Sequence, residues 1–198
     1  MTDTRAAAAL MGGIGLLERA INYALGSLHM VTPDTLPRPT PCSDWDLRAL
    51  LGHLDDSFAA LYEAADLGRV DLDVAADDRG STVDPVGGVR DRACQLVGAW
   101  ANAAEGPDTV CIAGSPLTAG IVSSTGALEV AVHGWDVARA CGRHHPIPPA
   151  LAEEMLSMSP LLISDADRPA RFAPPVEVGA LAAPGDRLVA FLGRNPSS

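Results

Sequence analysis

The sequence predicts an all-α fold, a four-helix bundle with short helical and extended additions at its C-terminal end. Hydrophobic residues make up 47% of the 198 residues but aromatic residues only 4%, so the core must consist mainly of Ala, Leu and Val. Alanine and leucine are strong helix formers. Apolar residues also recur at three-to-four spacing in four long segments, which is the pattern of amphipathic helices packed in a bundle.

The first two helices are predicted on either side of a proline-rich connection. Apolar spacing indicates a helix from about residue 5 to 31, and four prolines at 33–41 then interrupt it. A second helix is predicted over 43–67, with Ser43 as its N-cap. Asp46 would then lie in the first turn, where the helix dipole favours negative charge.

The third and fourth helices follow an acidic segment at 68–83, which we expect to form a surface loop. Asp and Pro open the third helix, predicted over 84–104. A short extended segment at 109–112 and a turn at 114–118 come next. The fourth helix is predicted to end at Cys141, and the sequence leaves its start open between residues 119 and 124.

The chain is expected to form a single domain over residues 1–198. Its four-helix core would occupy 1–145, and a C-terminal helix and tail at 146–198 would pack on that core. Two prolines open a helix at 148–158 within this part, and a final short helix is expected at 186–192.

The charge of the chain argues against two classes of partner. The formal net charge is −11, with 14 basic residues against 25 acidic ones. Such a chain repels the phosphates of nucleic acids and the surface of anionic membranes. No signal peptide is visible, and no apolar run approaches the ~20 residues of a membrane helix. The sequence therefore predicts a cytoplasmic protein.

The four cysteines show no pattern of a disulfide scaffold or a zinc finger. We therefore interpret them as reduced and mostly buried small side chains. The four are Cys42, Cys94, Cys111 and Cys141. Nothing in the sequence places Cys42 or Cys141 close to a functional site.

One helix pair and one further histidine form a candidate metal site. Glu129 and His133 are four residues apart, so they lie on one face of the fourth helix. His53 of the second helix can supply a third ligand, and two histidines with a carboxylate are a common ligand set for zinc and other first-row metals. From spacing alone, a surface ion pair and an ordinary boundary histidine explain these residues equally well.

Four stretches of the chain carry a family resemblance. They are TPCSDWDLR at 40–48 with LGHL at 51–54, ALEVAVHGWDVAR at 127–139, RFAPPV at 171–176 and DRLVAFLGR at 186–194. Together these resemble the mycothiol-dependent maleylpyruvate isomerase N-terminal domains, which belong to the DinB-like superfamily of metal-binding four-helix bundles. The resemblance implies that His53, Glu129 and His133 are the metal ligands. The isomerase has a further C-terminal domain for which this chain is too short, so we do not expect that isomerisation here.

The resemblance implies an enzyme similar to the mycothiol- or bacillithiol-dependent S-transferases. A divalent metal, most suitably Zn²⁺ and alternatively Ni²⁺, would activate a low-molecular-weight thiol such as mycothiol to attack a small electrophile. Two alternatives stay open, which are a hydrolase that uses metal-bound water and a non-catalytic metal-binding or ligand-binding module. Dimerisation of the chain through an exposed helix face also stays open.

Four further residues near the candidate ligands receive ordinary structural interpretations. Asp56 is expected to be a solvated charge, although it is three residues after His53. Asp136 is expected to form a local ion pair with Arg139. Trp45 and Trp135 are interpreted as packing residues whose indole N–H has a partner, and Trp135 could also line the site.

Overall fold

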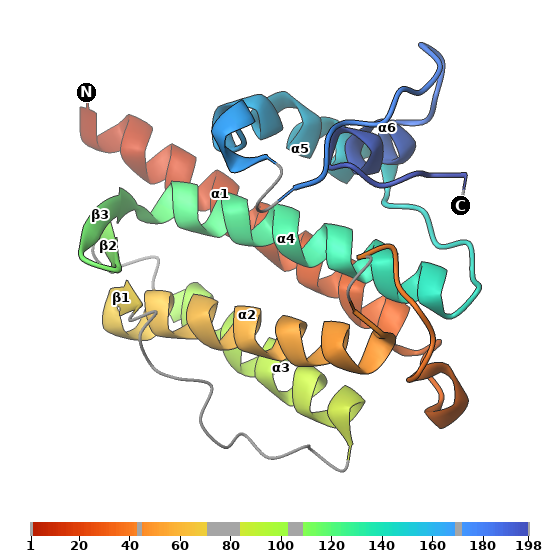
Figure 1. The fold of residues 1–198 in the computed structure, drawn as a ribbon. Helices are drawn as coiled ribbons and strands as arrows, with labels where there is room; N and C mark the ends of the chain where they lie inside the picture. The colour runs from red at the N-terminus through yellow and green to blue at the C-terminus, as the bar shows by residue number, and fades with distance from the viewer. Residues whose placement is uncertain (1, 43–44, 71–83, 103–108, 169–171, 198) are drawn as a thin grey trace.

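The computed structural model describes residues 2–42, 45–70, 84–102, 109–168 and 172–197. Most of these residues are helical, which confirms the all-α prediction (Figure 1). The bundle consists of α1 (Thr2–Leu28), α2 (Leu47–Leu67), α3 (Pro85–Asn102) and α4 (Ala119–Ala140). Two further helices, α5 (Pro149–Leu162) and α6 (Pro184–Phe191), pack against each other beside the bundle. No described helix is both long enough and apolar enough to cross a lipid bilayer.

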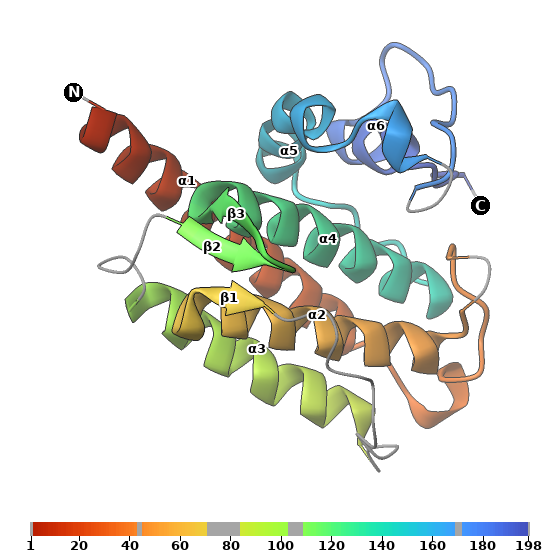
Figure 2. The same ribbon diagram turned by 60° about the vertical axis from the view of Figure 1, so that its left-hand side comes forward.

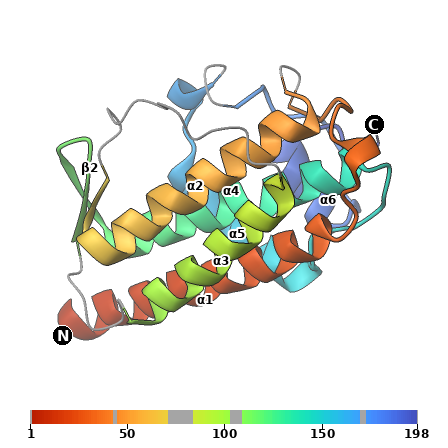
Figure 3. The same ribbon diagram turned by 90° about the horizontal axis from the view of Figure 1, so that it is seen from below.

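The fourth helix is the centre of the bundle, and it contacts α1 and α2 directly (Figure 3). Nearly all of its side chains are buried, including Val130, Ala131 and Val137. Gly134 allows α1 to come close, because a Cβ added there would lie only 2.9 Å from the Cα of Ala24. The tight α1–α4 contact therefore depends on the absence of a side chain at this position.

The observed ends of the helices correct one prediction. Asp46, not Ser43, is the N-cap of α2, and its carboxylate accepts a hydrogen bond from the backbone N–H of Ala49 at 2.8 Å. Ser43 itself lies outside the described residues. The helix ends at Gly68, which adopts a left-handed conformation (φ 63°) that glycine tolerates without strain. The backbone of Asp46 is extended, which places its carboxylate over the first free amides of the helix.

A small sheet lies at one end of the bundle (Figure 2). It contains β1 (Arg69–Val70), β2 (Thr109–Ile112) and β3 (Ser115–Thr118). The extended segment predicted at 109–112 is confirmed, but residues 115–118, predicted as a turn, form an antiparallel strand with it. The turn itself is shorter and consists of Ala113 and Gly114, both with positive φ, as in a two-residue hairpin.

The hairpin also settles where the fourth helix begins. Thr118, the last residue of β3, is the N-cap of α4, and the helix starts at Ala119, the earlier of the two predicted positions. The third helix was predicted to continue to residue 104, but residues 103–108 lie outside the described part of the chain, as do residues 71–83 of the predicted loop. The prediction of one domain over 1–198 stays a prediction.

The C-terminal part is held to itself by backbone and side-chain contacts. The N–H of Val176 donates to the carbonyl of Ala190 at 2.9 Å, and the guanidinium of Arg168 donates to the carbonyl of Phe191 at 2.8 Å. The helix α6 begins at Pro184, two residues before its predicted start. These contacts direct the chain after α6, which includes Arg194, back to the bundle.

Candidate metal centre

The structure brings together the three residues that the sequence selected. Helix α2 contributes His53, and helix α4 contributes Glu129 and His133. One oxygen of Glu129, Oε1, lies 2.8 Å from Nε2 of His53 and 3.0 Å from Nε2 of His133. The candidate ligand atoms of the three residues all lie within 4.8 Å of one another. Their role as metal ligands stays a prediction, but their convergence is a feature of the fold.

The helices explain this convergence. Glu129 and His133 are one turn apart on α4, so their side chains rise from the same face. On α2, the buried residues Leu50 and Leu54 flank His53 in the sequence and hold that part of the helix against the core. His53 itself is about one-third exposed (34%), as is Glu129 (33%), whereas His133 is buried at 6% exposure. The cluster thus lies where the core meets solvent.

Hydrogen bonding within the cluster controls its protonation. Burial alone would raise the pKa of Glu129, but hydrogen bonds from His133 and His53 outweigh it and hold the pKa well below its usual value. Burial would likewise lower the pKa of His133, yet its hydrogen bonds to Asp136, Cys42 and Glu129 raise the pKa well above 6.5. Glu129 is therefore a carboxylate, and His133 carries a proton at neutral pH unless a cation replaces it.

The other ring nitrogen of His133 faces a buried ion pair that the sequence did not predict. Nδ1 of His133 lies 3.0 Å from Oδ2 of Asp136, whose side chain is fully buried. The guanidinium of Arg194 lies 3.1 Å from the same oxygen. The predicted pair between Asp136 and Arg139 is wrong, because Arg139 lies over the ring of Trp135, 5.6 Å from its centre. Although Asp136 and Arg139 are three residues apart on one helix, their side chains do not meet, because Asp136 points into the core.

The pKa values of this pair follow from the contact. Burial would raise the pKa of Asp136, but the hydrogen bond from His133 and the charge of Arg194 lower it. Burial would lower the pKa of Arg194, and the charge of Asp136 raises it. Both side chains therefore stay ionised in a place with little water, and each supplies the counter-charge of the other.

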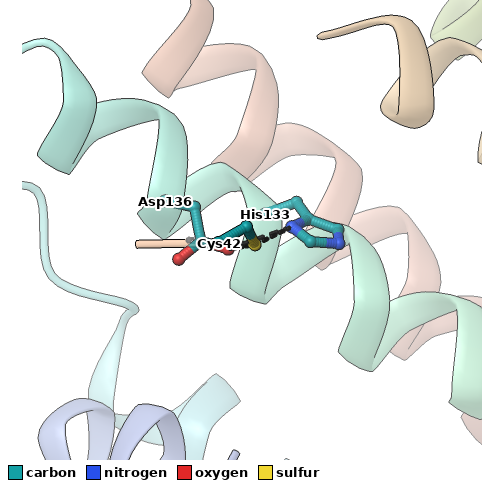
Figure 4. Close-up of side chains that lie close together, drawn as sticks. All are labelled: Cys42, His133 and Asp136. Carbon is teal, nitrogen blue, oxygen red and sulfur yellow. Dashed lines mark hydrogen bonds and ion pairs between the residues drawn. The ribbon is translucent and has the colours of Figure 1, made fainter. Parts of the chain in front are cut away.

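Cys42 also belongs to this cluster, contrary to the sequence-based expectation. Its Sγ lies 3.3 Å from Oδ2 of Asp136 and 3.9 Å from Nδ1 of His133, and Figure 4 shows the three side chains together. The backbone N–H of Thr40 donates to the carbonyl of Trp45 at 3.2 Å, and Cys42 between them lies against the C-terminal half of α4. Cys42, His133 and Asp136 form a second group of potential ligand atoms, and no spacing pattern in the sequence could have linked them.

The cysteines are free, as predicted, but the expectation that most of them are buried is wrong. Of the four, only Cys141 is buried, while Cys94 is exposed and the other two are partly exposed. Burial raises the pKa of the Cys141 thiol, which lies 3.9 Å from the hydroxyl of Thr35 and away from the candidate ligands.

An aromatic wall next to the cluster is formed by Trp45. Its ring centre lies 4.6 Å from that of His53 and 6.2 Å from that of His133. Trp135, interpreted from the sequence as a packing residue that could also line the site, is buried and contacts Arg139. Asp56 is exposed, as predicted, and belongs to neither group of potential ligands. Cys42 and Trp45, which both precede α2, therefore both lie at the site.

The donor set fits a divalent cation. Two imidazole nitrogens and one carboxylate oxygen are ligands that zinc and other first-row metals accept. The position of Asp136 adds to the fit, because histidines that bind metals usually donate their second N–H to a carboxylate or a carbonyl. His53 and Glu129 are partly exposed, so a ligand from solution has access to the same place.

Comparison with known proteins supplies a family. Residues 17–138 match the family model described as the mycothiol maleylpyruvate isomerase N-terminal domain, and this range includes His53, Glu129, His133 and Asp136 but not Arg194. A search of curated proteins and a search of solved structures gave no significant match. The matched family is one of mycothiol-related, metal-binding DinB-like domains. Because the match covers more than half of the chain, the protein belongs to the mycothiol maleylpyruvate isomerase N-terminal domain family.

Proposed function

We propose that this protein is a metal-dependent enzyme that transfers a low-molecular-weight thiol of the mycothiol type to a small electrophile. His53, Glu129 and His133 would hold the cation, with zinc the most suitable metal and nickel the alternative. The observation that carries the proposal is the convergence of these three side chains, from two helices, at the boundary between core and solvent. Membership in a mycothiol-related family supports the choice of thiol.

The residues around the cluster would divide the work of binding. Glu129 accepts hydrogen bonds from both histidines through one oxygen, so it orients the two rings toward the same point. Trp45 packs against His53 and restricts the motion of its ring. When bound, a divalent cation would supply Lewis-acid chemistry that favours loss of the thiol proton.

The proposed reaction breaks two bonds and forms two. The thiol sulfur bonds to the electrophilic carbon, while the thiol loses its proton and the electrophile loses its leaving group. Proton and leaving group together make one molecule of acid, so no oxidant or reductant is needed. The protein would accelerate this step by holding the sulfur and the carbon in contact and excluding water around them.

The first experiment is the metal content of tag-free protein, measured by elemental mass spectrometry before and after reconstitution with zinc. We expect about one metal per chain in the parent, and loss of that metal in His53→Ala and Glu129→Ala. Matched controls are His144→Ala and Glu153→Ala, which remove an exposed histidine and an exposed glutamate far along the chain. The controls should keep the metal, and circular dichroism should show that all four variants stay helical.

The second step tests the thiol. Zinc-loaded protein should bind mycothiol saturably in isothermal titration calorimetry and consume it with a reactive alkyl halide such as monobromobimane. Activity toward esters or amides without any thiol would instead identify a hydrolase. Zinc binding without thiol binding would leave a metal-binding module, and absence of zinc after reconstitution would overturn the proposal altogether.

A further inference from the structure

We propose that Arg194 is a positioning residue of the candidate metal centre, and that it acts through Asp136 to fix the ring of His133. The proposal rests on the proposed function insofar as it takes His133 to be a metal ligand. It assigns a role to the C-terminal part of the chain, which lies outside the residues matched by the family model. The site would then be incomplete without the segment that follows α6.

The contacts form one continuous line from the tail to the cluster. Nη2 of Arg194 donates to Oδ2 of Asp136 at 3.1 Å, and the same oxygen accepts from Nδ1 of His133 at 3.0 Å. On the far side of the imidazole ring, Nε2 faces Glu129. The hydrogen bond at Nδ1 restricts rotation of the ring about its side-chain bonds, so Nε2 keeps its direction.

Asp136 needs Arg194 to perform this task. The carboxylate is fully buried, and its second oxygen, Oδ1, has no hydrogen-bond partner among the residues that the structure describes. A buried carboxylate in this state is costly unless a counter-charge lies beside it. Arg194 provides the charge, and its side chain is itself only 12% exposed. Without the guanidinium, the unpaired charge would favour rotation of the Asp136 carboxylate toward water, and the hydrogen bond to His133 would break.

The local backbone aims Arg194 at this target. Gly193 has a φ of 83°, which reverses the chain directly after α6. The N–H of Arg194 then donates to the carbonyl of Val189 at 2.9 Å, and its Nη1 donates to the carbonyl of Leu192 at 3.0 Å. A second contact of Nη2, at 3.3 Å from Sγ of Cys42, closes the group. Besides the contact with Asp136, the guanidinium is thus oriented by two contacts, with Leu192 and with Cys42.

The rival explanation is that Arg194 merely fastens the tail to the bundle. Arg168 offers a matched control, because it also fastens the tail but through other partners. Its guanidinium donates to the carbonyl of Phe191 at 2.8 Å and lies over the Phe191 ring at 5.1 Å. Arg168→Gln therefore loosens the same segment and leaves the contacts of Asp136 in place. Arg194→Gln removes the contact with Asp136 itself.

The test is the zinc affinity of full-length protein, measured by competition with a chromophoric chelator. Loss of an outer partner of a ligand typically weakens metal binding by about 10-fold to 100-fold. We expect a loss in this range for Arg194→Gln and no change for Arg168→Gln. Simple removal of a positive charge near a cation would strengthen binding, so the sign of the effect separates positioning from charge repulsion. Equal losses in both variants, or tighter binding in Arg194→Gln, would overturn the proposal.

A double-mutant cycle tests the route of the effect. If Arg194 acts through Asp136, Arg194→Gln should weaken zinc binding in the parent but add no further loss in an Asp136→Asn background. Additive losses would show that Arg194 acts on its own and would contradict the proposal. Cobalt-loaded protein supplies a further readout, because the visible spectrum of cobalt reports its coordination geometry. The spectrum should change in Arg194→Gln and stay the same in Arg168→Gln.

A measurement without metal separates this proposal from the proposed function. In metal-free protein labelled with ¹⁵N, the proton on Nδ1 of His133 should give a downfield NMR signal because of its bond to Asp136. That signal should shift in Arg194→Gln and stay in place in Arg168→Gln. If the parent binds no zinc but the signal responds in this way, the proposed function fails while the positioning role stands. An unchanged signal in Arg194→Gln would overturn the positioning role, whatever the metal result.

Discussion

The two sides of the His133 ring differ in almost every physical property. On the exposed side, Nε2 faces His53 and Glu129, whose side chains are each about one-third exposed. On the buried side, Nδ1 faces Asp136, which is fully buried, and Arg194 lies behind it. Exchange of ligands with solvent is possible only on the exposed side, while a fixed orientation is best supplied from the buried side. The ring of His133 thus connects the partly exposed candidate ligands with the buried pair of Asp136 and Arg194.

The glycines beside the two histidines repeat this difference. Gly134 follows His133 and lies so close to Ala24 of α1 that an added Cβ would be 2.9 Å from its backbone. Gly52 precedes His53, and a Cβ added there would meet nothing within 4 Å. At Gly134, α4 therefore has no room for a side chain, whereas at Gly52 there is free space beside α2.

The largest effect on stability is expected for Asp136→Asn, which breaks the support on the buried side. Removing one partner of a buried ion pair typically costs about 3–5 kcal/mol, because the other charge stays behind unpaired. The matched control is Asp55→Asn, which breaks the partly exposed pair of Asp55 with Arg92. A pair that water can reach contributes about 0–1 kcal/mol. Urea unfolding of metal-free protein at pH 7 measures both values.

The loss of stability in Asp136→Asn should depend on pH. The folded-state pKa of Asp136 is lowered below 3.8, so its contribution is present above that value and is lost as the pH falls through the lowered pKa. The stability difference between the parent and Asp136→Asn should therefore shrink in strong acid. If the two substitutions cost the same at pH 7, the buried side would not be the stronger support, and the comparison would fail.

A smaller loss of stability is expected for Gly134→Ala. Overfilling a packed contact costs about 1–3 kcal/mol, and the better helix propensity of alanine returns at most about 1 kcal/mol. The net effect should be a loss, because the nearest atom is the Cα of Ala24, which cannot move without the backbone of α1. Zinc affinity should fall as well, since α4 must shift relative to α1. A stabilised Gly134→Ala protein would show that the α1–α4 contact has room to adjust.

Sequence reasoning predicted the exposed side better than the buried side. Glu129 and His133 could be found because they share a helical face, and His53 because it lies mid-helix beside an apolar stripe. The family resemblance implies the same three residues. The helical segments followed from apolar spacing, with errors at helix ends, at the strand 115–118 and at β1, which lies in the segment predicted as a surface loop. Periodicity within one helix is local information, and the sequence states it directly.

The buried side depends on contacts between segments that are far apart in the chain. Arg194 is 58 residues from Asp136, and Cys42 is 94 residues from it. No spacing rule joins such positions, so the nearest arginine in the sequence, Arg139, was chosen in error. The sequence contained one usable signal, which was the resemblance of residues 186–194 to the closing segment of related proteins. That signal indicated that the tail matters without indicating what it touches.

Acid should weaken zinc binding, because the cation competes with a proton on His133. Burial lowers the pKa of His133, but its hydrogen bonds, that to Asp136 first among them, raise the pKa well above 6.5. Below the raised pKa, apparent affinity should fall about tenfold for each pH unit. Titrations between pH 6.5 and 7.5 would measure this slope. In Asp136→Asn the slope should begin at lower pH, and a flat profile in the parent would show that His133 is not a ligand.

The smallest effect is expected on the exposed side, for Gly52→Ala. Glycine inside a helix costs roughly 0.5–1 kcal/mol relative to alanine, mainly because the unfolded chain loses more freedom. Since the new methyl group meets nothing within 4 Å, α2 can accept it without moving His53. The variant should therefore gain stability by that amount in urea unfolding and keep the zinc affinity of the parent. A loss of affinity would mean that the free space beside His53 is needed by the site, and the exposed side would then be as constrained as the buried one.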